Sequence, residues 1–171
     1  MIAAVVLAAG AATRYGRPKQ WELLPAVLER LARAPVDEIV VVQGAYPLEL
    51  PALPGPPVRL VDCPAWADGP GASLRCGLAA LSGSITHAVV VLADGPTLDP
   101  RAVARLIEQR ETADVLAASY DGARSHPVLL ARAAWARIPR EGGRALDAVL
   151  VDCSDLDPPG DVDVPATRGE F

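Results

Sequence analysis

The chain has 171 residues, of which 51% are hydrophobic, 22% charged and 4% aromatic. This length and composition predict one globular domain over residues 1–171 and exclude a disordered or repeat protein. The formal net charge of −5 and the pI near 5.0 leave no overall basic field, which argues against nucleic acid and anionic membranes as partners. An anionic substrate must therefore be held by local groups.

Apolar runs alternate with helical patterns along the chain, which is the rhythm of βαβ units with a parallel sheet. The apolar runs predict strands at Ile2–Leu7, Glu38–Val42, Val58–Val61, Ala88–Leu92, Asp114–Ala118, His126–Leu130 and Ala148–Val151. The helical patterns predict helices at Ala26–Ala34, Ala72–Leu81, Pro100–Gln109 and, as a short element, Ala131–Arg137. Proline and glycine gather at residues 47–57, 68–71 and 158–160, which predict loops within one α/β domain.

The cysteines and the first residues bear on the cellular compartment. Cys63, Cys76 and Cys153 are odd in number and far apart, and no two form a CxxC pair, so their spacing predicts neither a zinc site nor a disulfide framework. Cys76 is expected to be a small buried hydrophobic side chain on a helix. Met1–Leu7 has no basic leader and is too short for a signal segment or a membrane span. Together these features favour a reducing cytoplasm.

The first predicted strand runs into a glycine-punctuated loop, residues 7–19, that carries the cations Arg14, Arg17 and Lys19. Glycines permit close approach of the backbone to an anion, and backbone amides together with Arg14 and Lys19 could hold phosphate. No GK[ST] follows, so this is not a Walker loop, and the GxGxxG dinucleotide fingerprint is also missing. A surface loop with solvated basic side chains is the alternative interpretation.

Asp94 follows the fully apolar run Ala88–Leu92. Its carboxylate is therefore expected at the carboxyl end of a central strand, where open α/β sheets bind ligands. A hard carboxylate in that position suits magnesium, which bridges triphosphate oxygens. Asp94-Gly95-Pro96 is also ordinary turn chemistry, so the alternative is an aspartate that caps its own turn.

Five segments of the chain resemble, in order and spacing, the motifs of one known family. Residues 7–20, LAAGAATRYGRPKQ, look like the signature LAAGxSxRxGxxKQ, and residues 63–78, CPAWADGPGASLRCGL, are similar to NPxWxxGxxxSLxxGL. Asp94-Gly95-Pro96 falls at a D-x-P metal motif, residues 125–129 at GHPxLF, and residues 161–165 at DIDTP. The family is the MobA-like nucleotidyltransferases, in particular the molybdenum cofactor cytidylyltransferase branch.

The resemblance implies a single Rossmann-like three-layer α/β domain with a mostly parallel sheet that binds a nucleoside triphosphate at its carboxyl edge. The acceptor phosphate would attack the α-phosphorus and release pyrophosphate with Mg²⁺ as cofactor, and an already ionised acceptor needs no general base. The resemblance gives nucleotide-binding roles to Leu7, Ala8, Ala9, Gly10, Arg14, Lys19, Gly71 and Ser73. It gives catalytic roles to Arg14, Lys19 and Asp94, and metal coordination to Asp94 and Asp163, with Asp161 as a further candidate.

Three functions remain open at this point. The first is a cytidylyltransferase that uses CTP, with molybdopterin as the candidate acceptor, and it is favoured by LAAG where guanylyl-transferring relatives have LAGG. The second is a guanylyltransferase for another phosphorylated small acid. The third is a non-catalytic accessory protein that keeps the fold and binds nucleotide, or a molybdoenzyme or chaperone partner, without turnover.

Three departures from the family pattern concern the acceptor half of the site. Gly95 stands where the family usually has Gln or Met, and Ser125 where it has glycine before His-Pro. Glu141-Gly142-Gly143-Arg144 stands where relatives commonly carry GDxGAR. These departures leave the acceptor less determined than the nucleotide. His126, ahead of Pro127 at a predicted strand start, is expected to be structural rather than a contact to pterin or phosphate.

Overall fold

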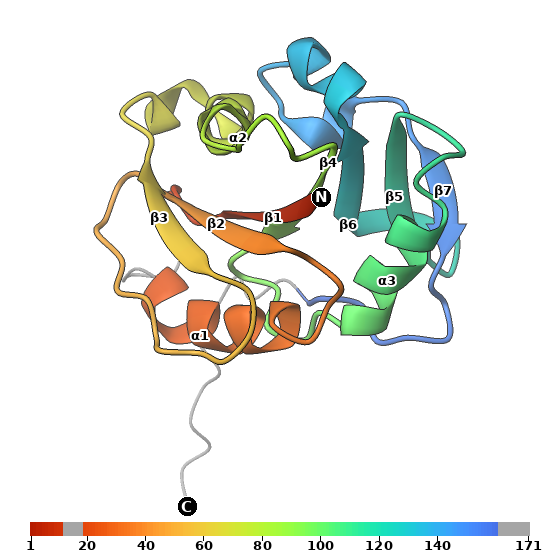
Figure 1. The fold of residues 1–171 in the computed structure, drawn as a ribbon, viewed down its shortest axis with the longest axis horizontal. Coiled ribbons are helices and arrows are strands. Elements are labelled where there is room, and N and C mark those ends of the chain that lie inside the picture. Colours follow the sequence, from red (N-terminus) through yellow and green to blue (C-terminus); the bar gives the residue numbers. More distant parts are fainter. Residues whose placement is uncertain (12–18, 161–171) are drawn as a thin grey trace, which may run out of the picture.

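The chain forms one seven-stranded sheet with helices on both faces (Figure 1). The computed structural model describes residues 1–11 and 19–160. The strands are β1 (Ile2–Leu7), β2 (Glu38–Gln43), β3 (Val58–Asp62), β4 (His87–Leu92), β5 (Val115–Tyr120), β6 (Ala123–Ala131) and β7 (Val149–Asp152). They lie in the order β3-β2-β1-β4-β6-β5-β7, and β6 is the one described strand that runs antiparallel to its neighbours. The mostly parallel sheet that the sequence predicts is confirmed.

Helices cover both faces of the sheet, and the strands are apolar on both faces for that reason. The helices are α1 (Gln20–Leu31), α2 (Pro70–Ala79) and α3 (Pro100–Glu108), with 3-10 helices η2 (Trp66–Asp68), η3 (Arg132–Arg137) and η4 (Gly143–Ala145). Figure 1 shows α1 and α3 on one face and α2 on the other. Along β1, Ala4 and Val6 join the core beneath α1 and α3, whereas Ala3 and Val5 join the core beneath α2. Such two-sided burial is typical of a parallel sheet between helical layers, so the three-layer α/β prediction is confirmed.

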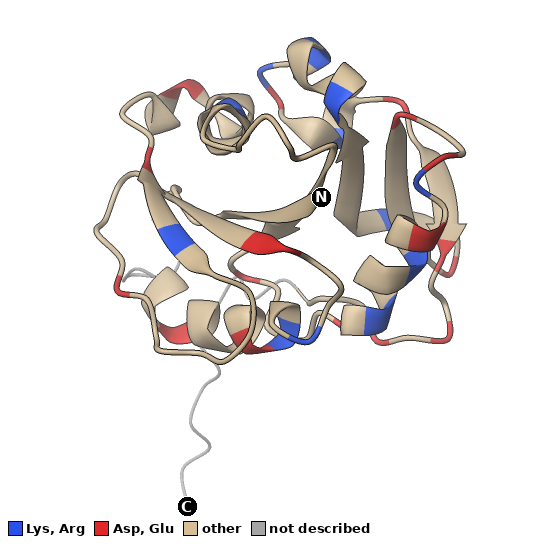
Figure 2. Ribbon diagram, in the orientation of Figure 1, with Lys and Arg blue, Asp and Glu red and all other residues tan. Residues whose placement is uncertain are grey.

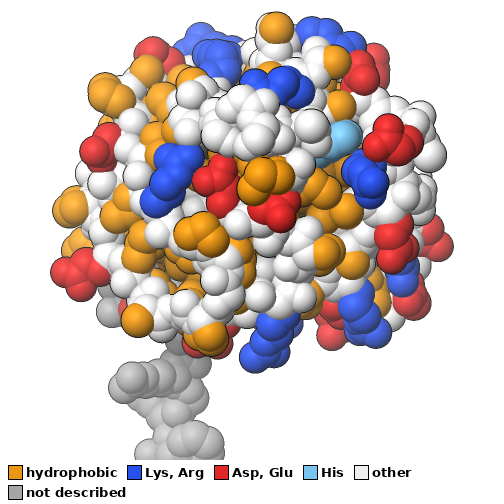
Figure 3. Space-filling view, in the orientation of Figure 1, with side chains coloured by type: hydrophobic (Ala, Val, Ile, Leu, Met, Phe, Trp, Pro, Cys, Tyr) orange, Lys and Arg blue, Asp and Glu red, His pale blue; other side chains and the backbone are white. Residues whose placement is uncertain are grey.

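Charged side chains lie mainly on helices, loops and strand ends (Figure 2), which leaves the layers between them apolar. On the face seen in Figure 3, Lys and Arg are interspersed with Asp and Glu, so no basic stripe crosses the described part of that face. The surface therefore offers local charges rather than one extended field.

α1 begins earlier than the sequence pattern predicts. The expected helix spans Ala26–Ala34, whereas α1 spans Gln20–Leu31 and contains Pro25. Its buried positions share one face of the helix: Gln20, Leu24, Val27, Leu28 and Leu31. Packing of this stripe outweighs the one backbone hydrogen bond that a proline cannot donate. The earlier start places the residues directly after Lys19 in a rigid element.

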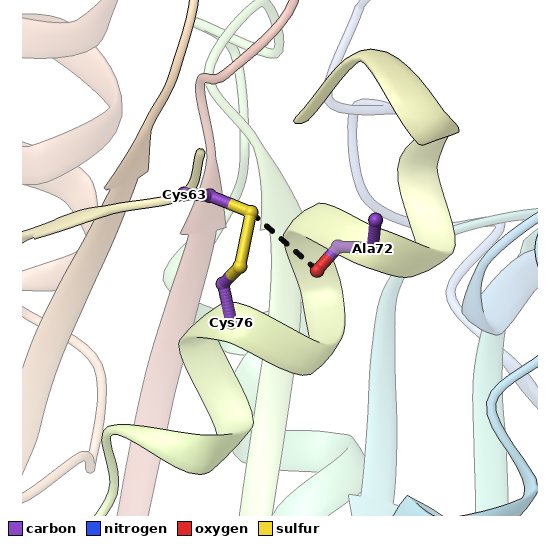
Figure 4. Close-up of a disulfide and its surroundings, with 3 residues drawn as sticks. All are labelled: Cys63, Ala72 and Cys76. Atoms are coloured by element: carbon purple, nitrogen blue, oxygen red, sulfur yellow. Dashed lines mark hydrogen bonds between the residues drawn. A yellow bond between two sulfur atoms is a disulfide. The ribbon is translucent and has the colours of Figure 1, made fainter. Parts of the chain in front are cut away.

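The prediction that the cysteines form no disulfide is wrong. Cys63 follows β3 directly, Cys76 lies on α2, and the two are joined by a disulfide across a Cα–Cα distance of 5.7 Å (Figure 4). The Sγ atom of Cys63 also lies 3.6 Å from the carbonyl oxygen of Ala72, and Cys63 is 1% exposed. The spacing of the two cysteines in the sequence does not reveal the pair. They come together only because the segment that contains η2 folds α2 back over β2 and β3.

The disulfide removes the cysteine-based argument for a reducing compartment, and Cys76 is a bridge rather than a simple buried hydrophobic side chain. Cys153 is buried and free. Within the described ranges, none of the helices combines the length and the apolar character that crossing a bilayer requires.

Breaking the Cys63–Cys76 bridge should lower the free energy of unfolding by about 2–4 kcal/mol, because a cross-link restricts the unfolded chain. Urea unfolding with and without reductant measures this change. The Cys63→Ser variant is the matched control, since reductant should change its stability no further. Thiol titration of the denatured chain should give one thiol without reductant and three with it, and three thiols in both conditions would contradict the disulfide.

Candidate active site

β1 and β4 end side by side at the carboxyl edge of the sheet. Leu7 pairs with Leu92 at the last position of the ladder, and the Ala93 N–H donates to the Leu7 carbonyl at 3.1 Å. The segments that follow the two strands therefore leave the sheet together, although more than eighty residues separate them in the sequence. This edge is the place where α/β sheets bind ligands.

Lys19 and Asp94 meet at this edge. Lys19 directly precedes α1, Asp94 follows β4, and the Lys19 Nζ atom lies 2.7 Å from Asp94 Oδ2. The two side chains are only 13% and 21% exposed. Within the described residues, this ion pair is the contact that the structure shows for the Asp94 carboxylate. The ion pair therefore holds this carboxylate in place.

A cavity of about 180 Å³ opens beside the ion pair. Its walls are Leu7, Gly10, Lys19, Gln20, Leu92, Ala93 and Asp94. Gln20 is 6% exposed, and its Nε2 donates to the Gly10 carbonyl at 2.8 Å, while its buried Oε1 has no hydrogen-bond partner in the described chain. A buried acceptor without a partner is costly, so Gln20 is suited to accept a hydrogen bond from a ligand. Sequence reasoning missed this residue, although it ends the first family signature.

The fold already uses part of the backbone of the predicted nucleotide loop. The Ala8 N–H donates to the Val42 carbonyl at 3.0 Å, and the Ala9 carbonyl accepts the Ala45 N–H at 3.0 Å. These two bonds tie the loop to the end of β2 and hold Gly10 at the cavity wall. Arg14, together with residues 12–18, lies outside the described residues.

Gly71 and Ser73, predicted to lie beside the nucleotide, sit in the first turn of α2. The Gly71 N–H donates to the Arg140 carbonyl at 2.9 Å, and a Cβ on Gly71 would lie 1.9 Å from the Pro139 carbonyl oxygen. Ser73 is 6% exposed, and neither residue lines the cavity beside the ion pair. A packing reason therefore accounts for the glycine, since any side chain there would collide with residues 139–140.

Gly95 has a packing reason of its own. A Cβ on Gly95 would lie 3.1 Å from Pro159 Cβ and 3.6 Å from the Gly160 carbonyl oxygen. Thr97 anchors the same segment, because its N–H donates to the Pro159 carbonyl at 3.1 Å and its hydroxyl donates to the Pro158 carbonyl at 2.8 Å. Gly95, which departs from the family motif, thus allows the segment that ends at Gly160 to lie across the end of β4.

The remaining predicted metal ligands follow that segment. Asp161 and Asp163 lie outside the described residues, and Gly160 is the last residue described before them. Among residues 1–11 and 19–160, no group of three or more His, Cys, Asp or Glu side chains is arranged to hold a metal ion. Asp94 is therefore the one predicted ligand that the described chain contains.

A second cavity of about 200 Å³ lies next to the first and shares Leu92 with it. Its walls are Val91, Leu92, Gly95, Leu98, Arg124, Ser125, His126, Arg144, Pro159 and Gly160. Two guanidinium groups and an imidazole therefore border the space beside Asp94.

His126 lines this cavity, whereas the sequence predicts a structural histidine. Burial first, and then the nearby cations Arg144 and Arg124, lower its pKa to about 4, although Asp94 acts in the opposite direction. The ring is therefore neutral at pH 7. β6 begins at Ala123 rather than at His126, so the histidine lies within the strand and not at its start. The structural role stays a prediction.

The geometry agrees with the comparison of the chain with known families. The profile of the MobA-like NTP transferase domain matches residues 4–152, which run from β1 to the end of β7. The chain belongs to this family. MobA-like domains are nucleotidyltransferase domains. The resemblance to the MobA-like family is therefore confirmed at the level of the family. The search of curated proteins found no significant match.

Solved structures share the fold of this chain over most of its length. A homologue of Mycobacterium tuberculosis Rv0371c from Mycobacterium sp. strain JC1 is 27% identical, with a TM-score of 0.71 over 95% of this chain and 90% of that chain. Rv0371c of M. tuberculosis H37Rv in complex with manganese is 24% identical, with a TM-score of 0.63 over 88% of each chain. The 4-diphosphocytidyl-2C-methyl-D-erythritol synthase of Anaerococcus prevotii is 14% identical, with a TM-score of 0.65 over 95% and 94% of the two chains, and shows the fold alone.

His126 should make the fold sensitive to acid. Its folded pKa of about 4 lies below the ordinary value of 6.5, so the unfolded chain binds a proton that the folded chain rejects between these values. The stability contributed by the neutral ring is complete above pH 6.5 and is lost as the pH falls toward 4. Relative to His126→Gln, wild-type protein should lose about 1–3 kcal/mol of unfolding free energy between pH 7 and pH 4. Urea unfolding at several pH values tests this, and a constant difference between the two proteins would refute it.

Proposed function

We propose that the protein is a magnesium-dependent nucleotidyltransferase that moves a nucleoside monophosphate from a nucleoside triphosphate to a phosphorylated acceptor and releases pyrophosphate. The observation that carries this proposal is the largely buried ion pair of Lys19 and Asp94 at the carboxyl edge, 2.7 Å apart, in a MobA-like domain. One cation and one metal-type ligand beside a cavity are the two parts that phosphoryl chemistry needs. The presence of nucleoside triphosphates in the cytoplasm supports a cytoplasmic protein.

The triphosphate would lie over Gly10, with Lys19 and Arg14 on its phosphates. Lys19 is well suited to this role because its position before α1 and its pairing with Asp94 fix its ammonium group at the cavity wall. A cation held in place before the substrate arrives stabilises the charge that builds on the leaving pyrophosphate without reorganising. Leu7, Ala8 and Ala9 would supply the floor of the nucleotide site, and Gly71 and Ser73 would approach the ribose or base.

Asp94 fits a magnesium ion, with Asp163 as the second ligand in this proposal. Mg²⁺ is usually held by one or two carboxylates together with substrate phosphates and waters, so a single described carboxylate at the cavity is sufficient on the protein side. When bound, the ion would neutralise the charge of the triphosphate. A manganese complex of the similarly folded Rv0371c supports a divalent cation in this family.

The chain itself would contribute alignment and charge compensation rather than a general base. An acceptor phosphate is already ionised at pH 7, so its oxygen can attack the α-phosphorus without losing a proton to the protein. The neutral His126 is compatible with this chemistry, because it adds no further charge to the acceptor side.

CTP is the proposed nucleotide and molybdopterin the proposed acceptor. The support is the LAAG sequence at residues 7–10, which resembles the cytidylyl-transferring branch. Gly95 and residues 141–144 depart from the family pattern on the acceptor side, whereas residues 7–10 keep the nucleotide motif.

Asp94→Asn should lower magnesium-dependent pyrophosphate release by about 100-fold or more, because the amide keeps the size of the side chain but not the charge that holds the metal. Binding of nucleotide without metal should change little or improve, since a repulsive carboxylate is gone. Asp62→Asn is the matched control, because Asp62 also ends a parallel strand, β3, and its Oδ1 only accepts a hydrogen bond from Gln43. Near-normal release by Asp94→Asn would rule out the metal role.

Calorimetry with magnesium should show tighter binding of CTP than of GTP or ATP. A tenfold preference corresponds to about 1.4 kcal/mol of binding free energy. If GTP bound tenfold more tightly than CTP, the cytidylyl assignment would be replaced by the guanylyl one, while the transferase class would stand.

A further inference from the structure

The second cavity presents positive charge that the described chain does not compensate. Arg124, on β6, and Arg144, on η4, both line this cavity. Within the described residues, neither side chain lies within ion-pair distance of a carboxylate. The remaining wall is apolar or neutral apart from these two groups and His126. An anion would be the natural complement of such a space.

Arg124 is fixed in position before any ligand binds. Its Nη1 donates to the Leu146 carbonyl at 2.6 Å and its Nη2 to the Gly143 carbonyl at 3.2 Å, while its buried Nε has no partner. Burial and the neighbouring Arg144 lower the pKa of the guanidinium, although Asp147 acts in the opposite direction. A buried donor without a partner is expensive, and a held guanidinium loses little entropy when an anion arrives.

The carboxylates near this cavity do not cancel its charge. Asp94 is the carboxylate that raises the pKa of His126, but its Oδ2 is engaged by Lys19 at 2.7 Å. The imidazole ring of His126 makes no hydrogen bond to another described residue, so a ring N–H is available to donate to a ligand oxygen. Arg144 is exposed and can move to meet a ligand at the mouth.

We propose that the cavity bordered by Arg124, His126 and Arg144 binds the phosphate group of the acceptor substrate. This inference rests on the proposed transferase function and assigns the acceptor side of that same site. The shared wall at Leu92 makes the two cavities neighbours, so a phosphate in the second lies beside a triphosphate in the first. One acceptor oxygen forms the new bond to the α-phosphorus, the bond from that phosphorus to the bridging oxygen breaks, and pyrophosphate leaves with the electron pair.

The size of the cavity restricts what else can enter. About 200 Å³ accommodates a phosphate and a few further atoms, whereas pockets for drug-sized molecules span about 300–1,000 Å³. A larger acceptor would therefore place its phosphate inside and its remaining groups beyond Arg144, at the mouth. The acceptor class is a phosphomonoester whose phosphate end is narrow.

Titration of the full chain with inorganic phosphate, followed by calorimetry, tests this assignment. Arg124→Met and Arg144→Met should each weaken phosphate binding by about tenfold or more, because each removes a charge-assisted hydrogen bond. Arg132→Met is the matched control, since Arg132 follows the other end of β6 and also donates to two backbone carbonyls, those of Ile85 and Ser82. Arg144 is exposed, so its variant reports on binding even if Arg124→Met folds poorly.

The same titration in saturating CTP and magnesium distinguishes a site for the acceptor phosphate from a site for a phosphate of the nucleotide. Phosphate binding that persists with nucleotide present assigns the cavity to the acceptor. Binding that nucleotide abolishes, or that neither arginine variant weakens, overturns the proposal. Asp94→Asn should retain phosphate binding while losing turnover, so a failure of the transferase function and a failure of this site give different results.

Discussion

The parallel pairing of β1 with β4 is the constraint on which the site depends. Because Leu7 and Leu92 end the ladder at the same level, the loops after them leave the sheet side by side, and Lys19 reaches Asp94. Both faces of β1 are closely packed, with Ala4 and Val6 in the core beneath α1 and α3 and Ala3 and Val5 in the core beneath α2, so a shift by one residue would disrupt the packing of both layers. The core thus fixes the level at which the two strands end, and the ion pair lies at that edge.

Close backbone contacts then bring the second half of the chain over this edge. Gly95 allows the segment around Pro159 to lie across the end of β4, and Gly71 allows Pro139 to approach the first turn of α2. The segment from Gly143 to Leu146 is in turn bound to Arg124 on β6. These contacts convert an open sheet edge into two adjoining cavities, one beside an ion pair and the other lined by two arginines that pair with no carboxylate within residues 1–11 and 19–160.

Much of the fold could be predicted from the sequence, because buried parallel strands leave continuous apolar runs. The order of strands and helices along the chain can be read directly from these runs. The position of Asp94 at the carboxyl edge was predictable because it follows such a strand, β4. Features that depend on contacts between distant segments were not predictable. The Cys63–Cys76 disulfide needs α2 to fold back over β3, and the place of His126 in a cavity wall depends on how β6 packs against the segments around Arg144 and Pro159. The early start of α1 was missed because Pro25 disfavours a helix interior when only the local sequence is considered. The buried face of α1, which includes Gln20, is stabilised by tertiary packing.

The central claim is that Lys19 and Asp94 form the phosphate and metal centre of a MobA-like transferase. The most direct test is a crystal of the protein with manganese and a non-hydrolysable CTP analogue, examined by anomalous scattering at the manganese edge. The predicted result is an anomalous peak within coordination distance of the Asp94 carboxylate, with the triphosphate in contact with Lys19 Nζ. A manganese peak away from Asp94, or a triphosphate bound elsewhere with the Lys19–Asp94 ion pair intact, would contradict it.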